Sequence, residues 1–403
     1  MRLYTLTSDL HGELAKNAHN EQFIKDIEAA IGQTFDYRES DFSDFGAFGD
    51  IIYVRTGGTE GVFKKVFEGH EGARVRLLTS GQSNSLAASM EILSWLNQQG
   101  LGGEIIHGSI SEIASDLLRY YPPVNQGRSK LIHTFVEPGI LAGKRYGVVG
   151  KPSDWLISSA VDYDKAKELL GAELVDIPIQ KLIDLARSAA NGADAGILAP
   201  RGTVSGGGPY GRPLTAEDFA GSDAIYRALL QIKKEYRLDG LTLRCFDLLT
   251  ALGNTGCLAL ARLNAEGCVA TCEGDIPAML SMAIVRKRFG KSGFQANLSR
   301  VEGDEFLFAH CTVPLDMVSD YCYDTHFESG IGVALHGILP QGPARIFKLG
   351  ADLEHCIDEA VEILGNPYGN NLCRTQIIVR GSSALRSYCL GSPLGNHHII
   401  VTI

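Results

Sequence analysis

The sequence contains no apolar run long enough to cross a lipid bilayer, which requires about 20 consecutive apolar residues. The N-terminal stretch MRLYTLTSDLHGEL has polar and acidic residues where a secretory signal peptide carries an apolar core. These two absences predict a cytoplasmic protein. An apolar fraction of 45% and a charged fraction of 21% are ordinary for a globular chain.

An excess of basic residues is also missing. Lys and Arg number 37 against 47 Asp and Glu, so the formal net charge is −10. Proteins that bind nucleic acids carry basic stripes that neutralise phosphates, and no such stripe is found in this sequence. We therefore expect no nucleic-acid partner, and the missing apolar run argues against a membrane partner. The global charge leaves an anionic small-molecule ligand open, because one local Lys or Arg can override it.

Local motifs for metal or phosphate binding are absent as well. The nine cysteines include no C-x-x-C pair, and their odd number argues against a disulfide framework or a thiolate zinc site. No H-E-x-x-H, EF-hand loop or P-loop occurs, and the glycine-rich stretches TGGTEG and SGGGPYG fit no phosphate-binding pattern. Any metal site must therefore combine residues that are distant in the sequence.

Strand-like and helix-like runs alternate through the first 290 residues. Residues 50–58 predict a strand that enters a glycine turn, and residues 74–100 predict a strand, a turn and a helix. This alternation is typical of parallel sheets covered by helices. A glycine-rich connection at 201–219 predicts a mobile loop. From about residue 291, short β-rich runs predict an antiparallel barrel or sandwich, interrupted by one helix at about 352–364.

The 403 residues are too many for one hydrophobic core. The changes in pattern divide the chain into an N-terminal α/β domain (1–143), a second α/β domain (144–290) and a β-rich C-terminal domain (291–403). The second domain carries two neighbouring acids, and the third carries most of the histidines that are candidates for chemistry.

The stretch TCEGDIPAML places Glu273 and Asp275 just after a predicted buried strand. Like charges repel, and burial makes each charge costlier, so water, a cation or a catalytic role must compensate. Ligands of parallel α/β sheets bind beyond the carboxyl ends of the strands, where these two acids are expected. Asp275 could instead cap the next helix. That alternative leaves Glu273 and the intervening Gly274 unexplained.

Among the eleven histidines, His310 and His326 fall in β-rich surroundings, and His397 and His398 form a pair near the C-terminus. Successive side chains of a strand point to opposite faces, so only one member of the pair can face a given site. Carboxylates with imidazoles and no thiolate suit Mn²⁺, Mg²⁺ or Co²⁺. The sequence therefore predicts a divalent cation site.

Several motifs together resemble the L-fucose/L-arabinose isomerase superfamily, in particular its short fucose-isomerase-like branch. They are CEGDIPAMLSM, FQANLSRVEGDEFLFAHCTVP and GNHH, with TGGTEGVF, NSLAASMEI, GVVGKPSDWLISS and RCFDLLTALGNTGCLALARLNAEG upstream. The resemblance covers most of the chain in order. It implies two flavodoxin-like parallel-sheet domains followed by an antiparallel β-barrel-like domain. It also implies a Mn²⁺-dependent intramolecular oxidoreductase that interconverts an aldose and a ketose, assembled as a trimer or hexamer whose neighbouring subunits complete the site.

Carried over residue by residue, the resemblance makes Glu273, His310 and His397 metal ligands. The fucose branch has a second metal-binding, catalytic acid at the position of Asn297. An asparagine offers a carbonyl oxygen to a metal or a substrate, but no charge and no proton-accepting group. Asp275 could substitute, so Glu273 and Asp275 are the predicted catalytic pair, and Asn297 is expected to contact both metal and substrate.

Two further residues are predicted to bind the substrate. Trp155 could stack on a sugar face, or it could be an ordinary core aromatic. Lys151 could meet an anionic group, or it could be a solvated surface lysine. Three functions remain open: an aldose–ketose isomerase that acts through an enediol, an isomerase or epimerase of a modified or acidic sugar, and a non-catalytic sugar-binding protein.

Overall fold

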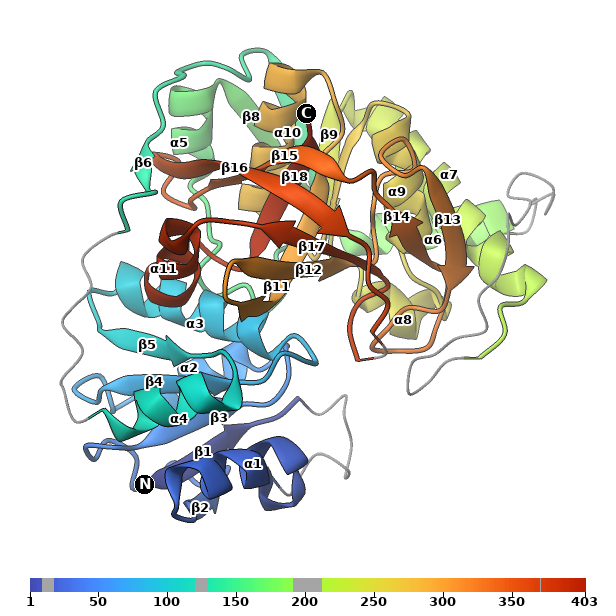
Figure 1. Ribbon diagram of the computed structural model, residues 1–403. Coiled ribbons are helices and arrows are strands. Elements are labelled where there is room, and N and C mark those ends of the chain that lie inside the picture. The colour runs from blue at the N-terminus through green and yellow to red at the C-terminus, as the bar shows by residue number, and fades with distance from the viewer. Residues whose placement is uncertain (9–17, 120–128, 191–211, 370) are drawn as a thin grey trace.

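The computed structural model describes residues 1–8, 18–119, 129–190, 212–369 and 371–403, so most of the glycine-rich connection at 201–219 lies outside the described residues. The described chain forms two parallel sheets and, late in the sequence, a closed antiparallel barrel of six strands (Figure 1). This architecture confirms the predicted order of parallel α/β units followed by a β-barrel. The predicted domain boundaries at 143 and 290 stay predictions.

The first sheet is parallel throughout, with strand order β2-β1-β3-β4-β5. Its strands are β1 (Arg2–Leu6), β2 (Asp36–Glu39), β3 (Ile51–Val54), β4 (Val75–Thr79) and β5 (Gly103–Ile106). Its helices are α1 (Gln22–Ile31), α2 (Glu60–Phe67), α3 (Ser85–Gln98) and α4 (Ile110–Leu118), with a 3₁₀ turn, η3, at Ala18–Asn20. Every residue of β3 and β4 is buried, as expected for strands that helices cover on both faces.

The second sheet is also parallel and has the order β10-β9-β7-β8. Its strands are β7 (Lys144–Val149), β8 (Ala172–Ile177), β9 (Gly240–Leu243) and β10 (Val269–Cys272). Its helices are α5 (Tyr163–Lys165), the π-helical turn η4 (Ala166–Leu170), α6 (Ile179–Ala190), α7 (Ala216–Tyr236), α8 (Asp247–Leu252), α9 (Cys257–Ala265) and α10 (Ile276–Phe289). In both sheets the first strand lies between the second and the third. Such a reversal of order opens a crevice beyond the carboxyl ends of the strands.

The barrel closes through pairing of its third and fourth strands in sequence, β15 and β16. Its strands are β11 (Phe294–Glu302), β12 (Glu305–His310), β15 (Gly342–Leu349), β16 (His355–Gly365), β17 (Thr375–Arg380) and β18 (His397–Thr402). The short strand β6 (His133–Thr134) pairs with the first two residues of β16. A separate two-stranded sheet consists of β13 (Asp320–Asp324) and β14 (Ala334–Ile338).

The predicted helix at about 352–364 is wrong, because this segment forms β16. Val361 and Ile363 are buried on either side of the exposed Glu362, which is the two-residue period of a strand. The run Asp-Glu-Ala-Val-Glu favours a helix locally, but β16 pairs with β15 along its length and with β17 at its end. This pairing outweighs the local preference. The helix of the barrel is instead α11 (Ser383–Gly391).

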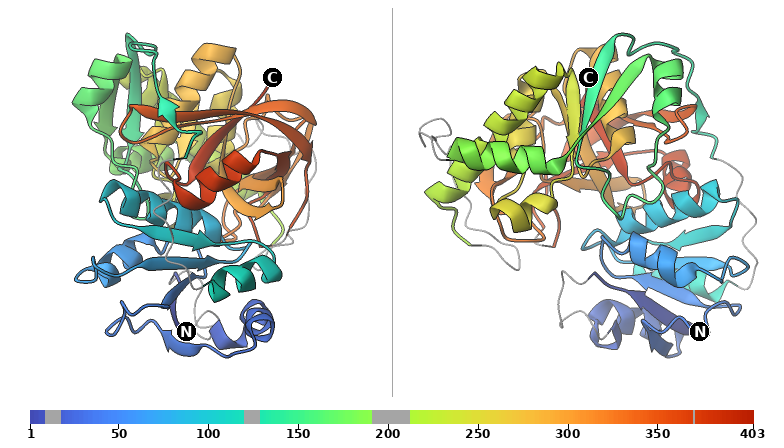
Figure 2. Two further views of the ribbon diagram at one scale, coloured as in Figure 1. Left: turned by 60° about the vertical axis from the view of Figure 1, so that its left-hand side comes forward. Right: turned by 180° about the vertical axis from the view of Figure 1, so that it is seen from behind.

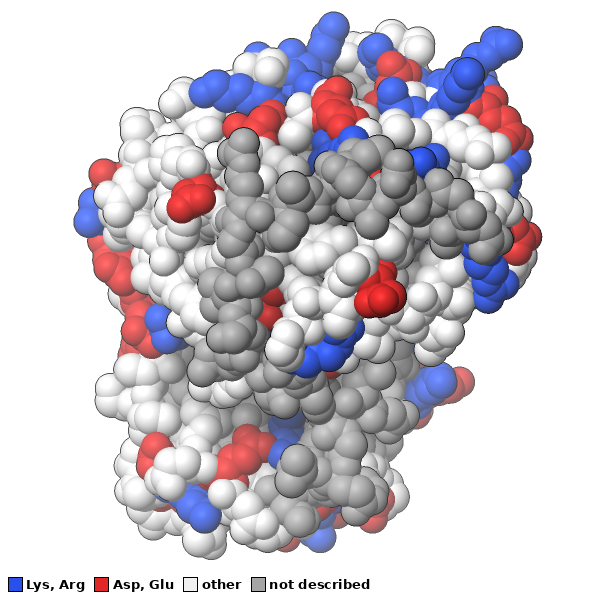
Figure 3. Space-filling view, turned by 90° about the vertical axis from the view of Figure 1, so that its right-hand side faces the viewer, with Lys and Arg blue, Asp and Glu red and all other residues white. Residues whose placement is uncertain are grey.

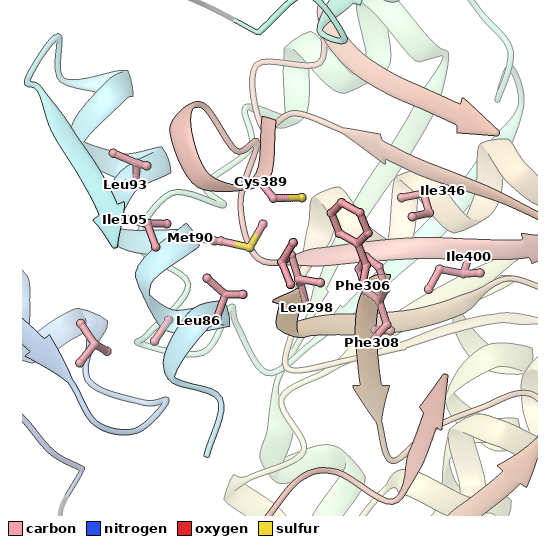
Figure 4. Close-up of a cluster of buried hydrophobic side chains, with 14 of the residues drawn as sticks. Leu86, Met90, Leu93, Ile105, Leu298, Phe306, Phe308, Ile346, Cys389 and Ile400 are labelled. Carbon is pink, nitrogen blue, oxygen red and sulfur yellow. The ribbon is translucent and has the colours of Figure 1, made fainter. Parts of the chain in front are cut away.

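One hydrophobic core joins the first sheet to the barrel. Figure 4 shows Leu86 and Met90 of α3 facing Leu298 of β11 and Cys389 of α11, while Leu93 lies beside Ile105 of β5. Full burial of one such side chain stabilises the fold by about 1.5–3 kcal/mol. In both views of Figure 2 the first sheet occupies one end of the molecule, and the second sheet and the barrel form the other. The core therefore fixes the barrel against the first unit.

On the face in Figure 3, basic and acidic side chains are interspersed among uncharged residues. No described helix combines the length and the apolar character that crossing a bilayer requires.

His107 ties the end of β5 to the barrel and makes the fold sensitive to acid. Its Nδ1 lies 2.6 Å from Thr79 Oγ1, and its Nε2 accepts the Val301 N–H at 3.0 Å, so the ring must be neutral. Burial, reinforced by the positive charge of Arg386, lowers the pKa of His107 to about 4 from an ordinary 6.5. Its stabilising contribution is therefore complete above pH 6.5 and is lost as the pH falls toward 4.

We expect His107→Gln to reduce the loss of stability between pH 7 and pH 5 by about 2 kcal/mol. The measurement is urea unfolding of wild type and variant at both pH values. His19→Gln, which changes an exposed histidine, serves as the control and keeps the wild-type pH dependence. An unchanged pH dependence in His107→Gln contradicts the assignment.

Candidate metal centre

A tight turn after β10 carries Glu273 to the carboxyl edge of the second sheet. Glu273 and Gly274 both have left-handed backbone conformations, with φ of 65° and 70°. A Cβ atom on Gly274 would lie 2.5 Å from the carbonyl oxygen of Lys151 and 2.9 Å from Cα of Pro152. The Glu273 carbonyl accepts the Ser153 N–H at 2.9 Å. The turn therefore requires glycine at 274, and the loop after β7 holds it in place.

Three side chains from distant parts of the sequence converge at this turn. Glu273 follows β10, His310 ends β12 and His397 begins β18. Glu273 Oε1 lies 3.5 Å from His310 Nε2 and 3.3 Å from His397 Nε2. The three ligand atoms lie within 4.8 Å of one another, and the residues are 8%, 4% and 0% exposed. They form a buried group that could hold a metal ion.

Asp275 lies behind His397, on the side of the ring away from Glu273. Its Oδ2 is 2.8 Å from His397 Nδ1, and its Oδ1 accepts the Ala278 N–H at 2.7 Å at the start of α10. Asp275 therefore caps α10, as the capping alternative predicts. Its other oxygen also orients the imidazole of His397. In metal sites, a ligand histidine commonly donates its second ring N–H to a carboxylate. This placement favours a positioning role for Asp275 over the predicted catalytic one.

The other groups of the cluster are also held by neighbours. Trp155 Nε1 donates to Glu273 Oε2 at 2.6 Å, which leaves Oε1 directed at the two histidines. Trp155 packs edge-on against Phe246, with ring centroids 4.8 Å apart. His310 Nδ1 lies 2.9 Å from Thr312 Oγ1. The three ligand groups thus have fixed orientations before any ligand binds.

The charges of the cluster are strongly coupled. Burial alone would raise the pKa of the Glu273 carboxyl, but the charge of His397 and the neighbouring His310 hold that pKa well below its usual value. Burial would likewise lower the pKa of His397, yet Glu273 and Asp275 raise it to about 10. Without a metal, the site therefore holds a proton on His397. A metal ion must displace that proton, so metal binding is expected to release protons.

A small cavity of about 40 Å³ opens beside Glu273. It lies where the carboxyl ends of both parallel sheets meet the barrel, the position predicted for a ligand site. Asn297, which pairs with His397 across β11 and β18, is 4% exposed, and its Oδ1 has no hydrogen-bond partner. The cavity is lined by six polar or charged side chains and four apolar or aromatic ones: Glu60, Asn84, Glu273, Asn297, Glu328 and Asn396, with Ala87, Ala88, Trp155 and Phe246.

The histidine pair behaves as strand alternation predicts. His397 joins the cluster, whereas His398 faces away from it, with Nε2 3.1 Å from Tyr388 Oη and Nδ1 2.9 Å from the Asn396 carbonyl oxygen. Burial lowers the pKa of His398 to about 3, so this ring is neutral. Only His397 is placed to bind a metal.

The structure does not bring Lys151 to the cavity. Its side chain is 73% exposed, and its Nζ lies 3.9 Å from Asp154 Oδ1 at the surface. Lys151 is therefore a solvated surface lysine, the second of the two roles considered for it. What matters at position 151 is the backbone carbonyl that Gly274 approaches. Trp155, by contrast, lies at the cavity wall, where a substrate-binding role requires it.

The residues present fit a divalent cation. Asn297 Oδ1 is buried without a hydrogen-bond partner, although such atoms normally find one, and His397 Nε2 has only the Glu273 carboxylate at 3.3 Å, with which it makes no well-aligned hydrogen bond. Neighbouring ligands of an octahedral ion bound at about 2.1 Å lie about 3 Å apart, close to the separations found here. Two histidines and one carboxylate also hold Zn²⁺ or Fe²⁺ in other proteins. The amide oxygen of Asn297 shifts the donor set toward oxygen, which suits Mn²⁺, Mg²⁺ or Co²⁺.

Sequence reasoning missed several residues of the cavity wall, among them Glu60, Asn84 and Glu328. Glu60 follows β3 and Asn84 follows β4, so both lie beyond the carboxyl end of a parallel strand. The rule that singled out Glu273 would have indicated them too. Glu328 follows β13, outside either parallel sheet, and the sequence carries no comparable signal for it.

We expect Asp275→Asn to weaken Mn²⁺ binding by about 10–100-fold, because the amide keeps the cap but removes the charge behind His397. The measurement is titration with Mn²⁺ followed by electron paramagnetic resonance of the free ion. Asp162→Asn is the matched control, since Asp162 caps α5 and contacts no histidine. Equal affinities of wild type and Asp275→Asn contradict this role.

No model of a known protein family matches the chain, and no curated protein is found to be similar to it.

Proposed function

We propose that the protein is a metal-dependent aldose–ketose isomerase of the short fucose-isomerase-like branch of the L-fucose/L-arabinose isomerase superfamily, acting on a fucose- or arabinose-like sugar. The observation that carries the proposal is the buried group of Glu273, His310 and His397 at the carboxyl edges of the parallel sheets. The order β2-β1-β3-β4-β5 of the first sheet, which is the flavodoxin-like order, supports it. The motifs that resemble the superfamily support it as well, because CEGDIPAMLSM contains Glu273, FQANLSRVEGDEFLFAHCTVP contains His310 and GNHH contains His397.

Glu273, His310 and His397 would hold the cation, with Asn297 as a neutral fourth donor. We propose Mn²⁺, with Mg²⁺ or Co²⁺ as substitutes. When bound, the cation polarises the carbonyl of an open-chain sugar and stabilises the charge that develops on its oxygens. Trp155 keeps Glu273 oriented and presents its ring at the cavity wall, where it can cover one face of the sugar.

The alternatives from the sequence fit the cavity less well. Three acids, Glu60, Glu273 and Glu328, line it, and the negative charge of Glu273, with that of Glu328 when it is ionised, repels the acidic group of a modified sugar. A non-catalytic sugar-binding protein has no use for two imidazoles and a carboxylate that are buried together with their ligand atoms within 4.8 Å of one another. A neutral aldose or ketose is therefore the substrate class we propose. Assembly as a trimer or hexamer and a cytoplasmic location belong to the same proposal.

The test is a panel of neutral aldoses and ketoses incubated with Mn²⁺-loaded protein in D₂O, with products followed by nuclear magnetic resonance. We expect one sugar pair to interconvert with deuterium at C1 or C2, which reports the enediol. The protein stripped of metal with a chelator is the control and gives no exchange. Metal-loaded protein that exchanges no hydrogen on any sugar contradicts the proposal. Sugar binding that needs no metal favours the binding protein.

A further inference from the structure

Two carboxylates of the cavity wall, those of the buried Glu60 and the partly buried Glu328, are not among the groups that could hold the metal. Glu60 is the first residue of α2 and is 2% exposed, and its Oε2 has no hydrogen-bond partner. Glu328, on the loop after β13, accepts from Asn84 Nδ2 at 2.8 Å. Both line the same cavity as Glu273 and Asn297. Glu60 follows a strand of the first sheet, and Glu328 lies on the loop between β13 and β14. The fold therefore brings together two acids that are far apart in the sequence.

Such an arrangement destabilises the protein unless it serves a ligand. Burying a carboxylate without a partner is unfavourable, and acids that face one cavity repel one another when they are ionised. Burial raises the pKa of Glu60 well above its usual value, and it raises the pKa of Glu328 to about 7 with help from the charge of Glu273. In the described part of the chain, no Lys or Arg forms an ion pair with either carboxylate.

The acids nearest the metal group are already engaged. Glu273 directs Oε1 at the two histidines and receives the Trp155 N–H on Oε2. Asp275 is fully buried behind His397, with one oxygen on the ring and the other on the helix N-terminus. Asn297 cannot accept a proton. Proton transfer on a substrate in the cavity therefore needs another carboxylate.

We propose that Glu328 is the catalytic acid–base of this site, and that Glu60 accepts a hydrogen bond from a substrate hydroxyl. The assignment rests on the proposed isomerase function. Glu328 is the better placed of the two for proton transfer, because it is only partly buried and its one hydrogen bond is to a neutral amide. That contact orients the carboxylate and leaves its other oxygen for the substrate. Glu60 is more enclosed, and its unpartnered Oε2 suits a fixed hydroxyl.

The proposed step conserves atoms and electrons. The Glu328 carboxylate takes the proton from C2 of the open-chain aldose. The C–H electron pair forms the C1–C2 double bond, and the carbonyl π pair moves to O1, which takes the proton of the O2 hydroxyl. In the resulting cis-enediolate the O2 electron pair then forms the C2 carbonyl, and the C1–C2 π pair takes the proton of the Glu328 carboxyl at C1. The ketose that forms has the atoms of the aldose, so no oxidant or reductant is needed.

The test compares Glu328→Gln, Glu328→Asp and Glu60→Gln, with the sugar that the wild-type protein turns over. Glu328→Gln is expected to bind Mn²⁺ within about twofold of wild type, because it removes no ligand. Its kcat and its hydrogen exchange in D₂O are expected to fall by about 10²–10⁴-fold with little change in KM, the usual contribution of a positioned acid–base group. Glu328→Asp is expected to restore part of the exchange.

Glu60→Gln makes the same chemical change in the same cavity and is the matched control. It is expected to raise KM more than it lowers kcat. Exchange by Glu328→Gln at the wild-type rate overturns the assignment and leaves the proposed function standing. Loss of Mn²⁺ binding in Glu328→Gln also overturns it, because Glu328 then serves the metal or the fold. Wild-type protein that exchanges no sugar hydrogen contradicts the proposed function, and the assignment falls with it.

Discussion

Replacing Glu273 by Gln is expected to weaken Mn²⁺ binding by more than about 100-fold, since loss of a contact behind a ligand already costs about 10–100-fold. Glu273 Oε1 lies between the two histidine nitrogens, at 3.5 and 3.3 Å. Gln keeps the shape and can still accept the Trp155 N–H, but it removes the single negative charge among the three ligand groups. The two remaining imidazoles attract a hard divalent cation poorly.

The measurement is Mn²⁺ titration followed by electron paramagnetic resonance, with the metal content of the purified protein as a second reading. Glu302→Gln is the matched control, because it makes the same change on an exposed carboxylate of β11. We expect the control to bind one Mn²⁺ per chain with wild-type affinity and to catalyse the wild-type exchange. Wild-type affinity in Glu273→Gln would mean that the metal binds elsewhere.

Replacing Gly274 by Ala is expected to destabilise the protein by about 3 kcal/mol or more. The residue has φ of 70°, which costs an L-residue about 1–2 kcal/mol. A Cβ there would also lie 2.5 Å from a backbone oxygen, and neither the Lys151 carbonyl nor Pro152 can move without shifting the loop after β7. That loop carries Trp155, so the substitution should also disturb the orientation of Glu273.

Gly290→Ala separates the two contributions. Gly290 ends α10 with φ of 64°, and nothing lies within 4 Å of the position of its Cβ. Its substitution therefore carries the backbone strain without the collision, and we expect a loss of about 1 kcal/mol in urea unfolding. Equal losses for the two variants would show that the close approach of Gly274 to Lys151 contributes nothing.

Local patterns were enough to predict much of the fold and part of the site. The strand at 50–58 and the strand and helix at 74–100 are confirmed as β3, β4 and α3, because their apolar periods and turns agree with the final structure. Glu273 was found because it follows a buried strand of a parallel sheet. The two-residue period of strands predicted that only one of His397 and His398 faces the site, and the family resemblance singled out His397.

The remaining features depend on contacts that no local pattern encodes. The segment 352–364 has a helical composition, and only its pairing with β15 and β17 makes it a strand. Glu328 joins the cavity because the β13–β14 loop packs beside α3, where Asn84 is the N-cap. The position of Lys151 on the surface likewise depends on how the turn at Gly274 meets the loop after β7.

The most direct test of the metal centre is anomalous X-ray diffraction from crystals grown with Mn²⁺, recorded on both sides of the manganese absorption edge. We predict a single strong peak per chain, in contact with Glu273 Oε1, His310 Nε2 and His397 Nε2 and next to Asn297. A peak at any other place, or none near these side chains at saturating Mn²⁺, would contradict the account.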